Sequence, residues 1–429
     1  FGNRPLTHIT ANAFAEAADA KAIVIPMTVR TFEWMDWTCT TRDIYFLGDR
    51  PEFIGTPPSY IRMHSISDRG GWSEEDTEIH DRHLYSGAVG KDPFTFRFVI
   101  IDGEAYIDRY IAGSYVVIPR SVVADGREYT VTCIGDASFM NVSESSLAEV
   151  YGLEYERYDL DTIEIPPTIT EIATLAFRGS TLRYLHGAES VVHIGDGAFR
   201  NCSSLTPVNL RDSLLYIGED AFLACSSKAF SRITVPSSVE HIGSRAFYGC
   251  SGLTSVSLDC RIPRIPDSCF AQCSSLTNIT IPETVRSVGD SAFYNCNSIL
   301  YIDLVNTEEV GTSAFQCAGK GSRLECVVFG ESLRTLGRNA FTGCKDLAEL
   351  EVYCVRPSGM DEAFQGLDLG SMKLYATSDV AEDWVGFDVE LLDEPEEEPD
   401  RTMMYVVVGM IVFFIVAGIL SLKYRTGFE

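Results

Sequence analysis

The chain has 429 residues, of which 34 are Lys or Arg and 61 are Asp or Glu, so its formal net charge is −27. This charge argues against a nucleic-acid partner, because binding to a phosphate backbone requires clustered Lys and Arg. Hydrophobic residues make up 45% and aromatic residues 11% of the chain, which is enough for a large core and argues against overall disorder. Thirteen cysteines are too few for a small fold held together by disulfides.

The N-terminal third contains short apolar segments at a regular spacing. The segment ITANAF ends at Phe14, and Trp37 follows 23 residues later, with the aliphatic stretch 23–29 between them. Because similar intervals recur through the rest of the chain, we interpret residues 1–72 as the end of a first repeat array that the sequence enters midway. The polar and acidic stretch after it predicts a linker over residues 73–93.

Residues 94–111 predict a β-hairpin. Their sequence, FTFRFVIIDGEAYIDRYI, alternates apolar and polar residues on both sides of Asp102-Gly103. An Asp-Gly pair between two alternating runs is typical of a tight hairpin turn. We expect this hairpin to form the N-terminal cap of a second array over residues 94–390.

One short motif recurs through this second array. An aliphatic residue and Gly are followed by two variable residues, a small residue, Phe, two more variable residues and Cys, as in IGSRAFYGC at 242–250. From Phe177 onward the anchor phenylalanines are 22, 23, 25, 23, 23, 22, 26 and 23 residues apart. Units this short cannot each bury an apolar face alone, so stacked copies must share one core. The ten anchors are Phe139, Phe177, Phe199, Phe222, Phe247, Phe270, Phe293, Phe315, Phe341 and Phe364.

The parts of one unit predict its local structure. Ile194, Ala198 and Cys202 are spaced by four residues, which favours one face of a short helical turn. The Asp, Glu, Ser or Thr that often follows the Gly is suited to capping that turn. The next segment reads LxxΦxΦ, where Φ is aliphatic, as at 253–258. Its alternation of aliphatic and polar residues predicts a strand with one buried and one solvent-exposed face. About ten stacked units at ~4.8 Å predict a solenoid roughly 50 Å long.

The unit IGxxAFxxC–LxxΦxΦP resembles the BspA-type leucine-rich repeat family over nearly the whole of residues 94–390. The resemblance implies an α/β-type solenoid with a parallel β-ladder and short helical or irregular connections. It also implies surface display and a role in adhesion or host-cell binding. Two copies depart from the pattern, since Phe177 is followed by Gly179-Ser180 and Phe364 by Leu367 in place of Cys. The stretch CAGKGSRL after Phe315 inserts a small loop in one unit.

The C-terminal end predicts a membrane anchor. Residues 403–422 are 20 residues without a charge, which as a helix would span about 30 Å, the thickness of a bilayer core. Lys423 and Arg425 follow at once, so the positive-inside rule puts the tail 423–429 in the cytoplasm and the bulk of the chain outside. Residues 391–402 contain six acids and two prolines in eight residues, which predicts an extended stalk.

The cysteines fall into two groups. Six of them stand three residues after an anchor Phe, and this register predicts a ladder of buried thiols that pack as small hydrophobic groups. Their side chains would point in parallel rather than toward one another, which disfavours disulfides between them. The ladder cysteines are Cys202, Cys225, Cys250, Cys273, Cys296 and Cys344. The sequence leaves open a disulfide among the other cysteines and does not assign its two partners. These cysteines are Cys39, Cys133, Cys260, Cys269, Cys317, Cys326 and Cys354.

Signals for metal binding or catalysis are weak. His80 and His83, with Glu78 and Asp81, form the one metal-like cluster, and its charged surroundings favour solvated charge over a metal site. The sequence has no CxxC pair, GxSxG, HExxH or GxxxxGK[ST] motif. The carboxylates are too scattered to single out a glycosidase pair. We therefore expect no metal, no cofactor and no catalytic residue.

The outward positions of the LxxΦxΦ strands are the candidate ligand-binding face. Repetition stacks them into an extended polar surface, and exposed aromatic residues suit recognition of proteins or sugars. The alternative is a face that is merely solvated. The candidate residues are Tyr184, His186, Ser255, Ser257, Asn278, Thr280, Tyr301, Asp303, Glu349 and Glu351. Three sequons, which begin at Asn141, Asn201 and Asn278, are candidate glycosylation sites.

These features predict a membrane-anchored cell-surface protein. It would bind an extracellular protein or glycan on a host or neighbouring cell by multipoint, non-catalytic contact. The first alternative is a structural spacer or coat of the cell envelope without a specific ligand. The second is a cell-wall or glycan enzyme whose catalytic module lies upstream of Phe1.

Overall fold

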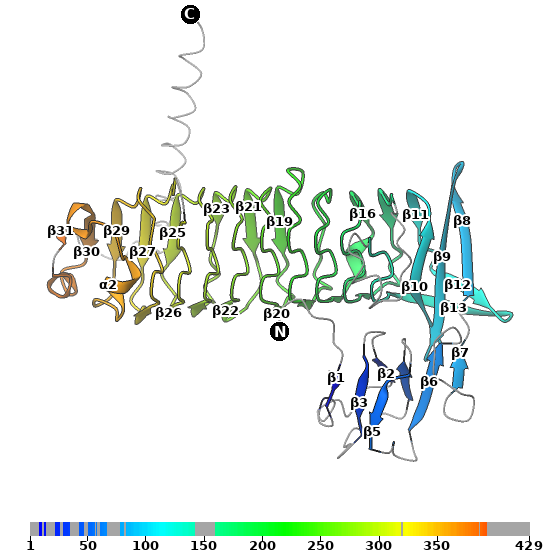
Figure 1. The fold of residues 1–429 in the computed structure, drawn as a ribbon. Helices are drawn as coiled ribbons and strands as arrows, with labels where there is room; N and C mark the ends of the chain where they lie inside the picture. Colours follow the sequence, from blue (N-terminus) through cyan, green and yellow to red (C-terminus); the bar gives the residue numbers. More distant parts are fainter. Residues whose placement is uncertain are drawn as a thin grey trace, which may run out of the picture.

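The repeats of residues 94–391 wind into an elongated β-solenoid (Figure 1). The computed structural model describes residues 83–141, 159–318, 321–385 and 387–392. It also describes short segments nearer the N-terminus: 8–10, 13, 22–25, 29–34, 43–46, 50–55, 57, 61–66 and 78–80. Each turn of the solenoid contributes one rung to a shared core, as the repeat interval predicts.

The described segments before residue 81 form two parallel sheets, and the first six strands alternate between them. One sheet contains β1 (His8–Ile9), β3 (Thr31–Glu33) and β5 (Glu52–Ile54). The other contains β2 (Ala22–Ile25), β4 (Asp43–Phe46), β6 (Arg62–Ile66) and β7 (Glu78–His80). Phe32 and Phe46 are buried between them, with ring centroids 5.5 Å apart. A chain that alternates between two parallel sheets in this way is coiled, as a repeat array is.

An antiparallel hairpin covers the N-terminal end of the solenoid. It consists of β9 (Asp92–Ile101) and β10 (Glu104–Ala112). At the turn Asp102 and Gly103 both have positive φ, 49° and 77°, which is why this turn favours Asp-Gly. On its other side β10 pairs in parallel with β13 (Arg127–Ile134), which also pairs with β12 (Ser121–Ala124). The hairpin thereby joins the sheet of the repeats.

The linker predicted over residues 73–93 contains strands. β7 extends one N-terminal sheet by pairing with β6, and β8 (His83–Val89) pairs antiparallel with β9. Exposure alternates along β8, because Tyr85 packs its ring 4.9 Å from Phe96 in the cap core. The linker-like composition comes from the acidic residues before β8, at 73–82.

The LxxΦxΦ segments form the predicted parallel ladder, here called the long-strand ladder, but it is divided into three sheets. The first sheet contains β11 (Tyr115–Val117), β14 (Thr162–Glu164) and β16 (Tyr184–His186). The second contains β19 (Arg232–Val235), β21 (Ser255–Leu258) and β23 (Asn278–Ile279). The third contains β25 (Tyr301–Leu304), β27 (Cys326–Phe329), β29 (Glu349–Val352), β30 (Lys373–Ala376) and β31 (Asp388–Leu391). The rung between the first two sheets carries Pro207, which has no N–H to donate to the ladder.

A second ladder, here called the short-strand ladder, was not predicted. Its two-residue strands contain the aliphatic residue that begins each unit, which in most units is followed by Gly. β15 (Glu171–Ile172), β17 (His193–Ile194), β18 (Tyr216–Ile217) and β20 (His241–Ile242) continue the sheet of β13. β22 (Arg264–Ile265), β24 (Ser287–Val288), β26 (Glu309–Val310) and β28 (Thr335–Leu336) form a separate sheet. Pro263 stands at the break, where it again removes a backbone donor.

The short helical turn predicted within IGxxAFxxC is wrong for most units. These units instead form consecutive tight turns, because the residue before the Ala and the residue before the Cys adopt the left-handed conformation. In one unit these residues are Arg245 (φ 57°) and Gly249 (φ 70°). Alternate N–H groups then bond to the neighbouring rung, as from Phe247 to the carbonyl of Cys269 at 2.9 Å. Within the described residues the only α-helix is α2 (Met360–Ala363), and 3-10 turns lie at 188–190, 369–371 and 381–383.

The anchor phenylalanines form one continuous column through the core. Neighbouring rings lie between 4.8 and 5.5 Å apart from Phe139 to Phe364, and all ten anchors are buried. Tyr110 of the cap extends the column with a ring 5.2 Å from Phe139. Buried Trp384 closes the C-terminal end near Phe329, and its indole N–H donates to the carbonyl of Cys354 at 2.9 Å.

The ladder cysteines are free and buried, as predicted. Each thiol donates to the carbonyl of the anchor Phe in the preceding rung, for example from Cys250 to Phe222 at 3.1 Å.

The Asp after the Gly also connects rungs and does not cap its own turn. The carboxylate of Asp196 accepts from the N–H of Glu219 at 2.8 Å, and that of Asp290 from the N–H of Thr312 at 2.7 Å.

Among the residues the structure describes, no helix is long and apolar enough to cross a bilayer. The predicted span at 403–422 lies outside the described residues. The same is true of the acidic run at 393–400 and of the tail at 423–429.

Candidate functional site

The predicted binding residues all lie on the solvent side of the long-strand ladder, but they do not form one uninterrupted row. Tyr184, His186, Ser255, Asn278, Thr280 and Glu349 are exposed, while Ser257, Tyr301, Asp303 and Glu351 are half-buried. Thr280 lies just beyond the end of β23. Because the ladder is divided, its outer face presents separate clusters toward its two ends.

The cluster near the N-terminal end is built around Tyr184. Its ring stacks against His186 at 6.2 Å, and the guanidinium of Arg183 lies 5.9 Å from the ring centroid. Arg183 is also paired with Asp161 at 3.4 Å. Arg183 and Asp161 are both substantially exposed, so this pair contributes little to stability and remains available to a ligand.

The cluster near the C-terminal end is larger and strongly acidic. β25, β27, β29, β30 and β31 pair in register, so Tyr301 lies in one row with Glu349, and Asp303 in the next row with Glu351. The rows continue through Lys373 and Tyr375 to Asp388 and Glu390. The hydroxyl of Tyr353 donates to Glu351, and Lys373 pairs with Glu390 at 3.4 Å. We call Tyr301, Asp303, Glu349, Glu351, Lys373, Tyr375, Asp388 and Glu390 the tyrosine–carboxylate face.

Burial between rungs alters the acid–base properties of this face. It raises the pKa of Tyr301 far above its usual value, and nearby Asp303 adds to the effect. The phenol therefore stays protonated and can donate a hydrogen bond. Burial also raises the pKa of Asp303, while the N–H of Val305, 2.9 Å from its carboxylate, acts in the opposite direction.

A row of stacked rings on the short-strand ladder was not predicted from the sequence. Tyr216 lies between His193 and His241, with ring centroids 4.5 Å apart on both sides and nearly parallel planes. His193 also lies 3.9 Å from the carboxylate of Glu171 in the preceding rung. The signal was present in the sequence, since each ring directly precedes an Ile-Gly pair. It was overlooked because no strand was expected there.

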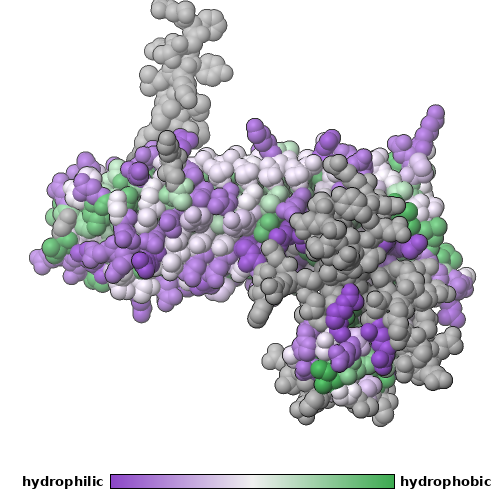
Figure 2. Space-filling view, viewed as in Figure 1, coloured by the Kyte–Doolittle hydropathy of each residue, from purple (hydrophilic) through white to green (hydrophobic). Residues whose placement is uncertain are grey.

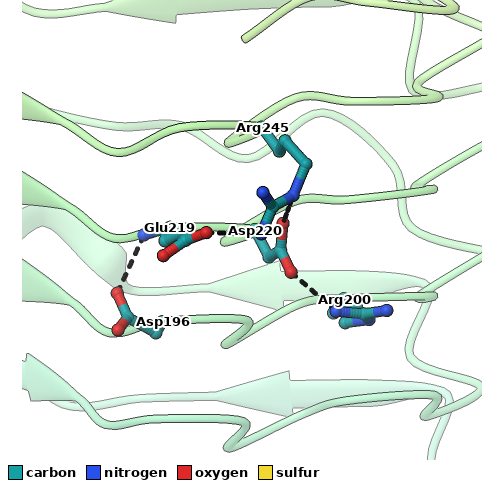
Figure 3. A network of polar contacts seen from close by, with 5 residues as sticks. All are labelled: Asp196, Arg200, Glu219, Asp220 and Arg245. Carbon is teal, nitrogen blue, oxygen red and sulfur yellow. Dashed lines mark hydrogen bonds and ion pairs between the residues drawn. The ribbon is translucent and has the colours of Figure 1, made fainter. Parts of the chain in front are cut away.

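A network of ion pairs lies beside these rings (Figure 3). The carboxylate of Asp220, whose side chain is only 8% exposed, accepts from Arg200 at 2.6 Å and from Arg245 at 2.8 Å. Arg245 also pairs with Glu219, whose N–H donates to Asp196. These contacts join three consecutive rungs. They hold the rungs together and leave little of Asp220 for a ligand.

The face of the solenoid seen in Figure 2 is mostly hydrophilic between the two ends. Of the exposed large apolar residues, Leu84 and Val123 lie on the cap strands, Val355, Val385 and Leu391 lie near the C-terminal rungs, and Leu215 lies between them. Single exposed apolar side chains are ordinary on protein surfaces. The two polar clusters of the long-strand ladder therefore remain the candidate site.

Comparison with known proteins identifies the repeat. The family model described as "BspA type Leucine rich repeat region" matches residues 148–259 and 225–348, in six copies. Residues 148–348 are a BspA-type leucine-rich repeat region. No curated protein sequence matches the chain.

Several solved structures are similar to the chain. A leucine-rich repeat protein from Bacteroides ovatus is 20% identical, with 68% of this chain and 100% of that chain covered and a TM-score of 0.34. The leucine-rich repeat protein of T. pallidum is 26% identical, with 48% and 87% covered and a TM-score of 0.41. A leucine-rich cell surface protein from Faecalibacterium prausnitzii is 19% identical, with 72% and 96% covered and a TM-score of 0.28.

The BspA-type repeats present two of the predicted glycosylation sites to solvent. Asn201 and Asn278 are exposed, and Asn141 is half-buried.

Within the described part of the chain, no three His, Cys, Asp or Glu side chains form a group that could hold a metal ion. His80 and His83 lie in β7 and β8, and Asp81 lies outside the described residues.

Asp136, at the start of the repeats, gives the fold a predicted pH dependence. Burial raises its pKa from 3.8 to about 7, and nearby Glu171 and Asp108 add to the effect. The unfolded chain therefore loses this proton near pH 4, whereas the folded chain keeps it until about pH 7. In this window the folded state binds more protons, so the stabilisation is complete below pH 4 and is lost as the pH rises toward 7.

We expect Asp136→Asn to remove this contribution. The amide oxygen can still accept from the N–H of Thr174, which now lies 3.1 Å from the carboxylate. Urea unfolding between pH 4.5 and 7 should show a shallower decline of stability with pH in the variant, by up to about 1.4 kcal/mol per pH unit. Equal slopes for the variant and the wild type would contradict the assignment to Asp136.

Proposed function

We propose that this protein is a cell-surface binding protein that attaches non-catalytically to an extracellular ligand through the outer face of its long-strand ladder. The tyrosine–carboxylate face is the observation that carries the proposal. It presents five carboxylates, two tyrosines and one lysine from four in-register strands. Strands fixed in register hold these groups in place before binding, which reduces the entropy lost on contact.

Charge favours a basic protein surface as the ligand. The face has a formal charge of −4, from five carboxylates and the ammonium of Lys373. Complementary charge speeds encounter and suppresses wrong partners, while tyrosines supply apolar area together with a hydroxyl donor. A neutral or anionic glycan would gain less from this arrangement. We therefore place a protein ligand ahead of a glycan.

Anchoring at the cell surface is part of the proposal and is supported by the sequence of the C-terminal end. Residues 403–422 are uncharged and Lys423 and Arg425 follow, which favours a single span with the repeats outside. Treating intact cells with a membrane-impermeant amine-reactive reagent should label the protein without lysis. Labelling that requires lysis would contradict this orientation.

A binding experiment separates attachment from a coating role. The purified chain, labelled and kept in mild detergent, should bind a candidate cell or matrix saturably. Excess unlabelled chain should compete with it, and raising the salt concentration should weaken binding because charged contacts are screened. Signal that grows without saturation, or that unlabelled chain does not displace, would favour a spacer or coat without a specific ligand.

A further inference from the structure

One pair of cysteines departs from the ladder pattern. Cys317 follows its anchor Phe315 by two residues, where the ladder cysteines follow theirs by three. Its sulfur lies 3.8 Å from the sulfur of Cys344 in the next rung. The two sulfurs are therefore in hydrogen-bond contact across neighbouring rungs.

The backbone explains why the two sulfurs meet. Cys317 occupies the position that Asn201, Ala224, Gln272 and Asn295 hold in other rungs, where the residue is left-handed and its side chain is at least partly exposed. Cys317 is not left-handed, and its side chain is buried. Its N–H still bonds to the next rung, at 2.9 Å from the carbonyl of Thr342. The side chain therefore turns toward the core, where Cys344 lies.

The two thiols also differ in a way that suits exchange chemistry. The thiol of Cys344 donates to Cys317 and to the carbonyl of Phe315, 3.2 Å away. The hydrogen bond from Cys344 lowers the pKa of Cys317, whereas burial raises the pKa of ladder cysteines such as Cys202 and Cys273. Cys317 is also 8% exposed, and Cys344 is fully buried. Cys317 is thus the more reactive and more accessible member of the pair.

We propose that Cys317 and Cys344 are a disulfide-forming site that links two adjacent rungs when a low-molecular-weight disulfide is present. The thiolate of Cys317 attacks one sulfur of that disulfide, whose S–S bond breaks and releases one thiol. Cys344 then loses its proton and attacks the sulfur of Cys317 in the mixed disulfide, which releases the second thiol. The two protein thiols are oxidised, the small disulfide is reduced, and both protons end on the released thiols. The sulfurs must approach from 3.8 Å to about 2.0 Å.

The test uses the purified chain and does not involve the proposed ligand. Incubation with glutathione disulfide is followed by denaturation without reductant, alkylation of free thiols and tandem mass spectrometry. We expect a peptide linked through Cys317 and Cys344, while Cys225, Cys250 and Cys273 are alkylated. Alkylation of both Cys317 and Cys344 after oxidation would overturn the proposal, and so would a bridge from Cys317 to another cysteine such as Cys326.

Single variants test the order of the two steps. Cys344→Ser should trap glutathione on Cys317 as a mixed disulfide, because the second thiol is missing. Cys317→Ser should leave Cys344 alkylated and without glutathione, because Cys344 is buried. Cys273→Ser, a standard ladder position, should still form the Cys317–Cys344 bridge. Circular dichroism confirms folding of each variant, and glutathione found on Cys344 in folded Cys317→Ser would contradict the assigned order.

Discussion

Replacing Phe247 by alanine is expected to lower the free energy of unfolding by about 3–5 kcal/mol, the usual cost of removing a fully buried aromatic ring. Phe247 is completely buried, and its ring lies 5.4 Å from Phe222 and 5.3 Å from Phe270. The substitution leaves a cavity in the middle of the phenylalanine column and removes both stacking contacts. Urea unfolding followed by circular dichroism measures the loss.

The same variant should also change the shape of the unfolding transition. Each rung of a repeat protein contacts only its neighbours, so a weakened central rung uncouples the two halves of the array. We expect a broader or two-step transition in Phe247→Ala. Phe247→Leu is the matched control, since it keeps most of the apolar volume and should cost less than about 1.5 kcal/mol. Similar losses for the two variants would contradict the role of the column.

Replacing Asp220 by asparagine is expected to cost about 1–3 kcal/mol, because it removes the negative charge that faces two partly buried guanidinium groups. Asp220 accepts from Arg200 and Arg245, whose side chains are 12% and 29% exposed. Its φ of 58° is left-handed, a conformation that Asn also tolerates. The substitution therefore removes the charge with little effect on the backbone. Thermal and urea unfolding both measure the loss.

An exposed ion pair provides the control for Asp220. Arg264 and Asp267 are 2.6 Å apart, but their side chains are 47% and 51% exposed. Asp267→Asn should therefore cost less than about 1 kcal/mol. If Asp267→Asn were as damaging as Asp220→Asn, partial burial would not explain the strength of the network.

The repeat interval was enough to predict the solenoid, its phenylalanine anchors and the buried thiols. A group that recurs at one position of every rung must stack on its own copies, so its burial follows from the register alone. The strand LxxΦxΦ was predictable for the same reason, since its alternation marks one buried and one wet side. The family resemblance stated from these residues was confirmed over residues 148–348.

The local backbone of the IGxxAFxxC motif could not be predicted in the same way. A spacing of four residues fits a helical turn, but left-handed residues such as Leu175 and Gln272 exclude one. These residue types give no sign of that conformation, which the stacking of rungs imposes. The role of Asp196 was misassigned for a related reason, since its partner is 23 residues away in the next rung.

The candidate site was only partly predictable. The outward positions of each strand followed from alternation, but the division of the ladder depended on tertiary pairing around residues such as Pro207. The stacked rings of His193, Tyr216 and His241 belong to strands of two residues. A strand of two residues is too short to show an alternation of apolar and polar residues in the sequence. Their existence depends on the neighbouring rungs.

The most direct test of the proposed function compares the two ladders by saturation binding to the same cell or matrix. Tyr184→Ala combined with Tyr301→Ala alters the long-strand ladder. Tyr216→Ala is the control, because it makes the same type of substitution on the short-strand ladder. We expect the double variant to raise the Kd about tenfold or more, as loss of aromatic anchors does, with Tyr216→Ala close to wild type. An unchanged Kd for a folded double variant would contradict the claim that the long-strand ladder is the binding face.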